Sequence, residues 1–462
     1  RLKMLHRCVA VFASCRAMAS NVATCQHVEV LVVGGGPSGI LLSLLLSGYK
    51  GYAKPAQHPD PDVAKKLQSV DFALPVTEWE LAKVARGLQG RANNEICVLL
   101  DQLHLPSAES LRDYPSLLEM RREPKDARSH VVVTQTVGGM WEAMNGTWAT
   151  LSPGSWMQLP GWTLDAFLSS TGRVANSQDR LERSIVADYY KAYVSHFDLS
   201  NSFLPGSRVE KVAKRDGGGW SVEVLTSDGQ RTIHADNVVL AGGSYSLPRR
   251  LSIPGEDLPF VSHRSKLTGP PAGTTLVVGA GLSAADLIIA LLRARKHVIH
   301  IFRTRADQTK IVDKFGRFSQ MYLEYFQLSE LMKGKLRSDL YKPWPSSQLV
   351  GVDEGGRCSV SQDGRLEYVQ ADEVRVLVGS SPDLTFLPEG VVSPPRTRGV
   401  LTSGDENPHE VFVDVDPGTF EASPGLFAVG PLRGANFVRF LVGDAFGVVS
   451  ALERQKNRQG AA

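Results

Sequence analysis

Apolar strands, glycine turns and apolar helices follow one another in the same order at two places along this chain. Five of the six residues 28–33 are apolar, which predicts a buried parallel strand, and the apolar stretch 40–46 predicts a helix after it. The same order returns at Thr274–Val278, an apolar strand, and at 286–292, an apolar helix. The pattern therefore indicates two strand–turn–helix units, one at the start of the chain and one in its middle.

Alternating polar and apolar residues with turns between them predict a β-meander after each unit, at 209–234 and at 348–370. A helix is expected at 188–197, and residues 62–130 are expected to be mostly helical. Further strands and a closing helix are expected at 131–133, 237–240, 297–302, 374–379, 425–430 and 441–452.

Three glycines join the first strand to its helix. Gly34, Gly36 and Gly39 have the spacing G-x-G-x-x-G, with Pro37 and Ser38 between them. At this spacing Gly34 allows the tight turn, Gly36 lets the backbone approach a pyrophosphate, and Gly39 lets the helix pack on the strand. Free N–H groups at the helix start attract phosphate, since the dipole places roughly +0.5 charge there. We interpret this turn as a dinucleotide site; a glycine-rich turn without a ligand is the alternative.

A second turn with nearly the same spacing lies in the middle of the chain. Gly279, Gly281 and Ala284 have the spacing G-x-G-x-x-A, and Ser283 lies beside them. Two dinucleotide-binding turns in one chain indicate two cofactors that face each other.

Two arginines lie just past the end of the strand expected at 297–302. Arg303 lies 24 residues after Gly279, where an acid would select NAD. An arginine at this position suits the 2′-phosphate of NADP instead, and Arg305 is a weaker candidate with the same chemistry. The alternative is an exposed surface arginine.

A flavin-binding fold usually ends its second strand with an acid that holds a ribose hydroxyl. We expect that strand at 49–54, which contains no acid, while Asp60 and Asp62 come later in a proline-rich loop. The ribose contact is therefore unassigned.

Four of the seven tryptophans are close together in the sequence: Trp141, Trp148, Trp156 and Trp162. They are either an aromatic core or the lining for a flat ring system such as isoalloxazine. Trp141, at the end of the sequence GGMW, is the candidate for cofactor binding.

Composition narrows the function classes. The net charge of +3 gives no argument for nucleic-acid binding, and no apolar run approaches the roughly 20 residues that span a bilayer. The five cysteines form no C-x-x-C pair, which disfavours a dithiol reductase and is typical of a reducing compartment. No metal-ligand cluster or Ser-His-Asp set is recognisable, so we predict no metal site.

Several motifs carry a resemblance to a known group of proteins. The glycine turn at 34–39, GGMW at 138–141, LAGG at 240–243 and GAGLSA at 279–284 occur in the order of two-dinucleotide-binding flavoproteins, including flavin-containing monooxygenases. The stretches GGGPSGILLSLLLSGY, SPGSWMQLPGW and VGPLRGANFVRF resemble more closely the oxidative stress-induced growth inhibitor family.

This resemblance implies an NADPH-dependent, FAD-type monooxygenase fold. It also implies roles in growth restraint, differentiation and late cell division, with localisation at the midbody. Two departures from the motifs of flavin-containing monooxygenases weaken the case for efficient oxygenation. Residues 152–155 lack the asparagine that those enzymes place there, and residues 260–265 only partly match their aromatic-Gly-His signature.

Pattern and resemblance together predict an α/β fold with two Rossmann-like domains of the FAD/NAD(P)-binding superfamily, each with a β-meander insertion. We expect the following organisation: a disordered extension at 1–27, the first part of an FAD-binding domain at 28–265, an NADPH-binding domain at 266–380, and the return segment of the FAD-binding domain at 381–462. The basic, acid-free extension could also be a mitochondrial presequence, but we expect a cytoplasmic protein.

Three functions stay open. The first is a monooxygenase in which NADPH reduces FAD, and reduced FAD activates oxygen towards a small-molecule or protein nucleophile. The second is an NADPH oxidase that mainly releases hydrogen peroxide. The third is a regulatory protein that binds protein partners.

Gly430 is predicted to contribute a turn at the flavin. His263 is a weak candidate on the nicotinamide side, with a loop histidine as the alternative. Asp444 is a weak candidate for the ribityl chain.

Overall fold

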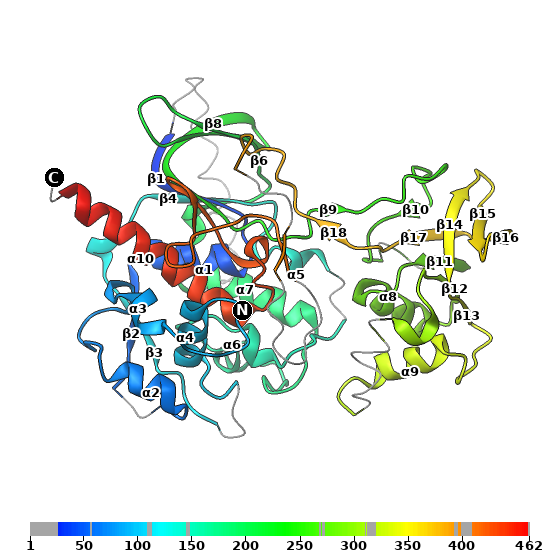
Figure 1. Ribbon diagram of the computed structural model, residues 1–462, viewed down its shortest axis with the longest axis horizontal. Helices are drawn as coiled ribbons and strands as arrows, with labels where there is room; N and C mark the ends of the chain where they lie inside the picture. Colours follow the sequence, from blue (N-terminus) through cyan, green and yellow to red (C-terminus); the bar gives the residue numbers. More distant parts are fainter. Residues whose placement is uncertain are drawn as a thin grey trace, which may run out of the picture.

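A computed structural model describes residues 26–460 of the chain, apart from 56–57, 109–112, 145–147, 268, 270–272, 310, 312–319, 392–395 and 399–408. The predicted extension lies outside the described residues except for Gln26 and His27, which begin the first strand. Figure 1 shows two units that lie beside each other.

The first unit is built around β1 (Gln26–Val33), at the predicted position of the first strand. β1 pairs in parallel with β4 (His130–Val133) on one side and with β8 (Gly229–Leu240) on the other. The neighbours Leu31 and Val32 point to opposite faces and are both fully buried, as expected for a strand covered on both faces. The other strands of this sheet are β5 (Phe203–Leu204), β6 (Arg208–Lys214), β7 (Trp220–Thr226), β21 (Glu421–Ser423) and β22 (Leu426–Ala428).

β8 belongs to both the meander and the parallel sheet. Its first part pairs antiparallel with β7, and its last residues pair in parallel with β1 and β22. The sequence predicts two strands here, at 232–234 and 237–240. The structure has one, because Ala235 between them pairs with both Val28 of β1 and Trp220 of β7, which keeps the chain extended.

Helices cover the sheet of the first unit. α1 (Pro37–Leu46) packs against α10 (Leu441–Gly460), and α1 is buried from Ser38 to Leu46. The other α-helices of this unit are α2 (Pro61–Leu67), α3 (Leu81–Ala85), α4 (Glu95–His104), α5 (Met140–Ala143), α6 (Leu164–Ser170) and α7 (Arg183–His196). Short 3-10 helices are η1 (Val76–Glu78), η2 (Pro124–Asp126), η3 (Gly154–Met157), η4 (Ser200–Ser202), η7 (Gly430–Arg433) and η8 (Val438–Phe440).

A long segment separates α1 from β4. It contains α2, α3 and α4, and also an antiparallel pair, β2 (Tyr49–Ala53) with β3 (Leu118–Arg122), which stands outside the main sheet. The expectation of a mostly helical segment holds for its middle part.

The second unit contains a wholly parallel five-stranded sheet with the order β10-β17-β11-β12-β13. Its strands are β10 (Val261–Ser262), β11 (Thr274–Val278), β12 (His297–Ile301), β13 (Tyr341–Trp344) and β17 (Glu373–Val376). The helices are α8 (Leu282–Arg293), η5 (Ala306–Gln308) and α9 (Leu323–Met332). The predicted second meander is formed by β14 (Ser347–Val352), β15 (Arg357–Gln362) and β16 (Arg365–Gln370). Each Rossmann-like sheet thus carries a meander, as predicted.

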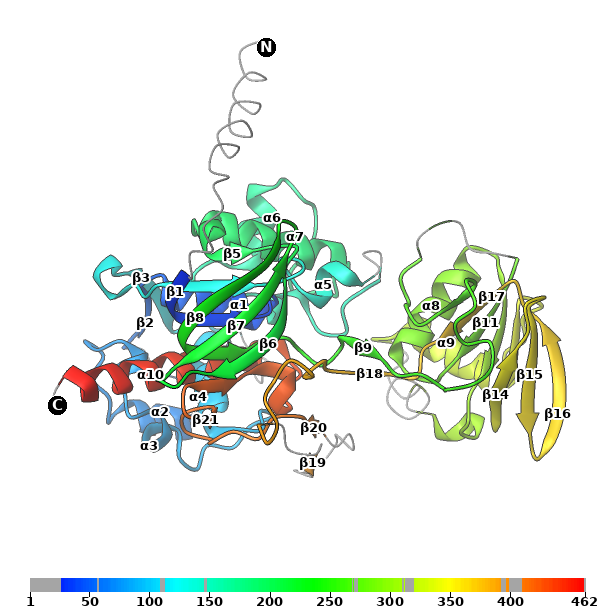
Figure 2. The same cartoon turned by 90° about the horizontal axis from the view of Figure 1, so that it is seen from above.

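Two chain crossings join the units through a small antiparallel sheet, β9 (Leu247–Pro248) with β18 (Ser380–Ser381) (Figure 2). β10 pairs with β17 of the second sheet, so the chain enters the second unit before residue 265, where the boundary is predicted. The return of the chain to the first unit is predicted at 381, and β18 ends at this residue. One further antiparallel pair among the described residues is β19 (Arg396–Arg398) with β20 (His409–Val411).

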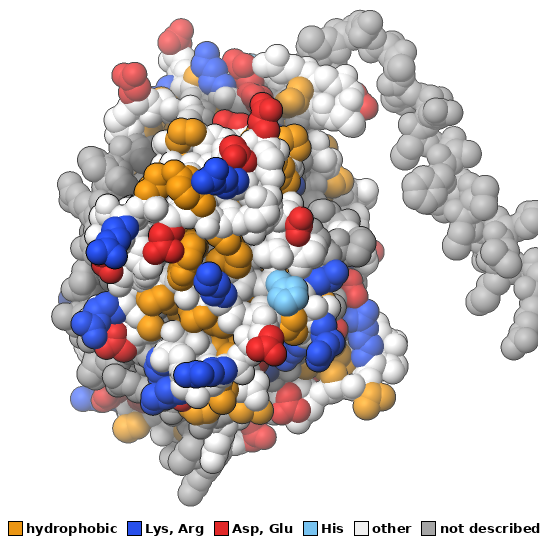
Figure 3. Space-filling model, turned by 90° about the vertical axis from the view of Figure 1, so that its right-hand side faces the viewer, with side chains coloured by type: hydrophobic (Ala, Val, Ile, Leu, Met, Phe, Trp, Pro, Cys, Tyr) orange, Lys and Arg blue, Asp and Glu red, His pale blue; other side chains and the backbone are white. Residues whose placement is uncertain are grey.

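The outer face of the second unit shows basic and acidic side chains interspersed with scattered hydrophobic ones (Figure 3). This mixture agrees with the nearly balanced charge of the chain. Among the described residues, no helix is long and apolar enough to cross a membrane.

Candidate functional site

The turn between β1 and α1 requires glycine at two positions. Gly34 has φ +115°, and a Cβ there would lie 2.5 Å from the Ala241 carbonyl oxygen. A Cβ on Gly39 would lie 1.9 Å from the Gly34 carbonyl oxygen. These distances support both predicted roles: a tight turn at Gly34, and close packing of the helix on the strand at Gly39.

Gly36 is different, because a Cβ on it would meet nothing within 4 Å. It is the N-cap residue of α1, where no side chain caps the helix, and the first turn contains no acid. Pro37 is the first residue of the helix, and Ser38 is buried behind the turn. The start of α1 thus presents free N–H groups beside open space, which suits a phosphate.

Segments far apart in the sequence meet at this turn. The Gly138 N–H group donates a hydrogen bond of 2.8 Å to the Gly35 carbonyl oxygen. A Cβ on Gly139 would lie 3.0 Å from Gly36 Cα, and one on Gly430 would lie 3.1 Å from Ser38 Oγ. We call this assembly of the turn with Gly138–Gly139 and Gly430 the first cradle.

Trp141 lies in α5, directly after the first cradle's Gly139, and its ring centroid is 6.2 Å from that of Tyr190. The other three tryptophans are engaged elsewhere. Trp148 packs with the second unit, Trp156 lies under the Arg439 guanidinium at 4.3 Å, and Trp162 stacks on His196 at 4.3 Å. Of the four, Trp141 is the one that stays a candidate for the cofactor.

The prediction of the second parallel strand at 49–54 is wrong. Residues 49–54 were expected to end the second parallel strand, but β2 pairs antiparallel with β3. The parallel neighbour of β1 is β4, which leads into Thr134 and the exposed Gln135. The long insertion before β4 misplaced the strand; the apolar run at 131–133 shortly before GGMW was the signal that could have found it.

Both carboxylate oxygens of Asp444 are hydrogen-bonded within the protein. Its Oδ2 accepts a hydrogen bond of 2.6 Å from the Gly430 N–H group, and its Oδ1 accepts one of 2.8 Å from Arg433 Nε. The Cys97 thiol also donates to Oδ1 at 3.0 Å, and burial raises the pKa of this thiol. Asp444 is fully buried and holds the Gly430 turn in place, a geometry that favours a structural role over contact with the ribityl chain.

The turn between β11 and α8 repeats the geometry of the first. Gly279 has φ +123°, and a Cβ there would lie 2.2 Å from the Leu377 carbonyl oxygen. Gly281 is the N-cap of α8 without a side-chain cap, and a Cβ on it would meet nothing within 4 Å. Ser283 is exposed, and Ala284 is fully buried where the first turn has Gly39. We call this turn the second cradle.

Both predicted arginines follow β12 and are exposed. Arg303 lies one residue after the buried Phe302 and has no ion-pair partner among the described residues. Arg305 pairs with Asp307 at 3.3 Å between Nε and Oδ1. Arg303 is therefore the more available of the two for an anionic ligand.

His263 is held by a loop of the second unit. Its Nε2 lies 2.8 Å from Glu256 Oε1, and the Glu256 side chain is only 2% exposed. The same carboxylate accepts backbone N–H groups of Leu251 and Ser252 at 2.8 and 2.7 Å. This geometry favours the alternative, a loop histidine, over a role at the nicotinamide.

Polar contacts connect the units beside the crossing strands. Arg183 of α7 donates to Asp286 Oδ2 of α8 at 3.0 Å, and Tyr325 donates to Asp286 Oδ1 at 2.5 Å. Burial raises the pKa of Asp286, although Arg183 opposes this. The Arg183 contact, which the sequence did not predict, holds α8 against the first unit, and the Tyr325 contact joins α8 to α9 within the second unit.

Among the described residues, no group of His, Cys, Asp and Glu could hold a metal ion. The two described cysteines, Cys97 and Cys358, are free and buried, so they form no redox pair.

This chain is similar to known proteins both in sequence and in fold. The profile of a family described as pyridine nucleotide-disulphide oxidoreductase matches residues 162–407. The oxidative stress-induced growth inhibitor 1 of Mus musculus is 33% identical over 480 residues, covering 95% of this chain and 98% of that protein.

Two solved structures show the same fold at low identity. A bacillithiol disulfide reductase of Bacillus cereus has a TM-score of 0.59 at 16% identity, covering 93% of this chain and all of that one. An ornithine N-hydroxylase of Kutzneria sp. 744, solved with reduced FAD, NADP+ and L-ornithine, has a TM-score of 0.55 at 14% identity and covers the same shares.

Proposed function

The chain belongs to the oxidative stress-induced growth inhibitor family and has the fold of flavoprotein oxidoreductases, and from this we propose that it is an NADPH-dependent flavin monooxygenase. The proposal assigns FAD to the first cradle and NADPH to the second. The family's name suggests that this chemistry serves growth restraint under oxidative stress.

The observation that carries the proposal is the pair of open turns. At Gly36 and at Gly281, a helix begins without a side-chain cap, and a Cβ would meet no protein atom within 4 Å. The glycines of the tight turns, Gly34 and Gly279, instead have backbone atoms within 2.5 Å of a Cβ position. Packing explains those two, whereas a phosphate that approaches the backbone explains Gly36 and Gly281.

In the first cradle, the N–H groups around Gly36 and Ser38 would hold the pyrophosphate of FAD. Gln135, at the end of β4, would meet the ribose hydroxyls through its amide, where other flavoproteins use an acid. Trp141 would lie against the ring system. Asp444 keeps the Gly430 turn against Ser38 and so shapes the cradle from behind.

In the second cradle, the N–H groups around Gly281 and Ser283 would hold the pyrophosphate of NADPH. The exposed guanidinium of Arg303 would pair with the 2′-phosphate. The contact of Arg183 with Asp286 fixes α8 relative to the first unit, and the contact of Tyr325 with Asp286 fixes it relative to α9; together they fix the start of the second cradle.

Bound flavin supplies the redox chemistry, by accepting hydride from the nicotinamide and passing electrons to oxygen. This chain's residues bind and orient the two cofactors. They need not supply a nucleophile, and the described residues contain no free redox cysteine pair.

A regulatory protein without efficient turnover is the second candidate. Gln135 favours it, because a neutral amide forms weaker hydrogen bonds to a ribose than a carboxylate does. An NADPH oxidase is the third candidate, since residues 152–155 lack the asparagine of flavin-containing monooxygenases.

One experiment separates the three. The full chain is purified, offered FAD, reduced with NADPH without air and then mixed with oxygen. A flavin absorbance that passes through a species distinct from both the reduced and the oxidised form, before oxidised flavin and peroxide are released together, supports the monooxygenase. Immediate stoichiometric peroxide supports the oxidase, and a colourless protein that does not take up FAD contradicts both enzymes and supports the regulatory role.

A further inference from the structure

A buried histidine lies directly beneath the second cradle. His300, on β12, is 1% exposed. Its Nε2 lies 2.7 Å from the Gly279 carbonyl oxygen, and its Nδ1 lies 2.7 Å from the Tyr341 hydroxyl on β13. The ring therefore connects the first glycine of the turn to the neighbouring strand.

The chemistry of these partners determines where the protons lie. A carbonyl oxygen only accepts, so Nε2 must carry a proton and donate it to Gly279. A neutral ring then leaves Nδ1 as the acceptor, and the Tyr341 hydroxyl donates to it. Burial lowers the pKa of His300 to about 4, in agreement with a neutral ring at physiological pH.

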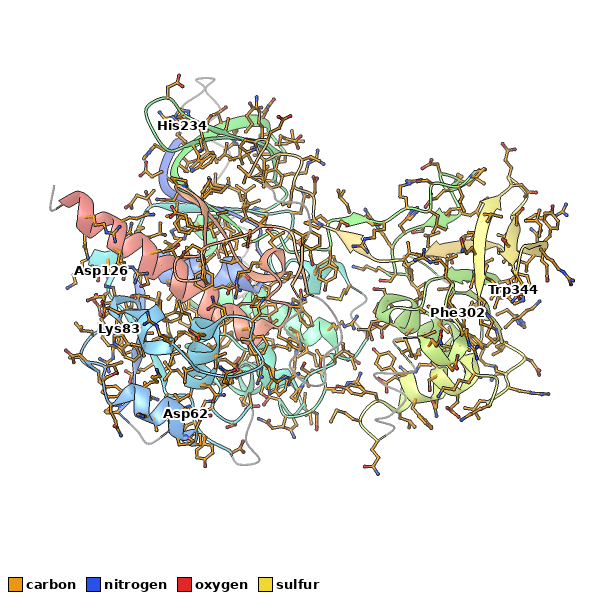
Figure 4. All side chains as sticks on the ribbon, viewed as in Figure 1. Asp62, Lys83, Asp126, His234, Phe302 and Trp344 are labelled. Carbon is orange, nitrogen blue, oxygen red and sulfur yellow. The ribbon has the colours of Figure 1, made fainter. Side chains whose placement is uncertain are left out.

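β12 holds the Gly279 peptide from two sides. The Gly279 N–H group donates to the Ile301 carbonyl oxygen at 2.9 Å, and the Gly279 carbonyl accepts from His300. The ring of Phe302 lies 4.7 Å from that of His300, and Figure 4 shows Phe302 inside the second unit. The next residue is Arg303, so one strand fixes both the turn and the arginine.

We propose that His300 and Tyr341 are positioning residues that fix the dinucleotide-binding turn through the Gly279 carbonyl. This inference rests on the proposed binding of NADPH to the second cradle. Because the turn would hold the pyrophosphate, which NADPH and NADH share, the two residues support both dinucleotides equally. Arg303 distinguishes them.

The first cradle has no such support. Among the described residues, no side chain donates a hydrogen bond to the Gly34 carbonyl oxygen. Loss of His300 or Tyr341 should therefore leave FAD binding unchanged.

The test compares His300→Leu, Tyr341→Phe and His300→Gln in the full chain loaded with FAD. Gln keeps an N–H group close to the position of Nε2 and should restore binding. His104→Leu is the matched control, since His104 is an equally buried histidine in the first unit. Calorimetry measures the Kd of NADP+ and NAD+, and the KM and kcat of each reduced form, the FAD content and the Tm are measured alongside.

We expect His300→Leu and Tyr341→Phe to raise Kd and KM for both dinucleotides by the same factor, about three- to tenfold, with kcat and FAD content retained. His300→Gln should lie near wild type, and His104→Leu should lower Tm without changing Kd. If Kd is unchanged in both His300→Leu and Tyr341→Phe, with or without a lowered Tm, the inference about these two residues is overturned, while the proposed function stands. A wild-type protein that binds neither dinucleotide would overturn the proposed function as well.

Discussion

At the scale of single residues, the two cradles separate glycines required by packing from glycines required by a ligand. Gly39 has no space for a side chain, because a Cβ would overlap the Gly34 carbonyl oxygen at 1.9 Å. Gly36, with φ −76°, has ordinary backbone geometry and open space around it. A methyl group at Gly36 would therefore occupy volume that only a bound molecule uses.

We predict that Gly36→Ala removes FAD from the purified protein, while the Tm of the FAD-free variant stays at or slightly above that of the FAD-free wild type. Alanine has the smaller unfolded-state entropy, worth about 0.4–1 kcal/mol where the native backbone accepts it. Flavin content by absorbance and Tm by calorimetry check this. Gly217→Ala is the control, since its Cβ also meets nothing within 4 Å but lies in a surface turn. Full FAD content in Gly36→Ala would contradict the role of the first cradle.

Arg303→Asp should raise the KM for NADPH at least tenfold, a loss of about 1.4 kcal/mol, because it replaces an attraction for the 2′-phosphate by a repulsion. The KM for NADH should change little, since NADH lacks that phosphate. Steady-state kinetics with both dinucleotides measure the ratio. Arg305→Asp is the comparison and should have a smaller effect, as Arg305 already pairs with Asp307. An unchanged NADPH KM with flavin retained would remove Arg303 from the site.

At the scale of elements, the sequence identified both strand–turn–helix units, both meanders and the closing helix. These succeed because apolar runs, glycine spacing and period-2 alternation are local signals. The neighbour of β1 could not be read in the same way. β2 follows α1 directly but pairs with β3, while β4 arrives only after the insertion of residues 47–129. Which strand pairs with β1 is decided by the tertiary fold, and the place where the ribose contact is sought depends on this pairing.

The corrected topology makes Gln135 testable. Gln135→Glu places an acid at the end of β4, and a carboxylate hydrogen bond to a ribose hydroxyl is roughly twice as strong as a neutral one. We predict about three- to tenfold tighter FAD binding, measured by flavin release on dilution. Lys54→Glu, an acid at the end of β2, should change nothing. Tighter binding in Lys54→Glu and none in Gln135→Glu would return the contact to the position first expected.

At the scale of the whole molecule, the two units are joined by the β9–β18 crossing and by the contact of Arg183 with Asp286. Each unit also has a buried histidine whose pKa is lowered to about 4, His104 in the first and His300 in the second. None of this was predictable from one sequence, because each contact joins residues far apart in the chain.

The two histidines predict how stability depends on pH. Desolvation lowers the pKa of His104 and of His300 to about 4, while an unfolded histidine titrates near 6.5. Between pH 4 and pH 6.5, about the two pKa values, each histidine is protonated in the unfolded chain but neutral in the folded protein. The free energy of unfolding therefore falls as pH decreases from about 6.5 to about 4. Each histidine accounts for up to about 3 kcal/mol of this loss.

Denaturant unfolding at several pH values measures the effect. His104→Gln and His300→Gln should each flatten the decrease below pH 6.5, whereas His297→Gln, at an exposed position on β12, should not. Equal slopes in the wild type and in both buried-site variants would show that other groups cause the acid instability.

The most direct test of cooperation between the cradles is anaerobic mixing of the FAD-loaded protein with NADPH while the visible absorbance of the flavin is recorded. We predict complete loss of that absorbance at a rate that saturates with NADPH. Gly281→Ala should retain FAD but lose the reaction. Bound FAD that keeps its absorbance at saturating NADPH, or a Gly281→Ala variant that reacts like the wild type, would contradict the assignment of the two cradles to two cofactors.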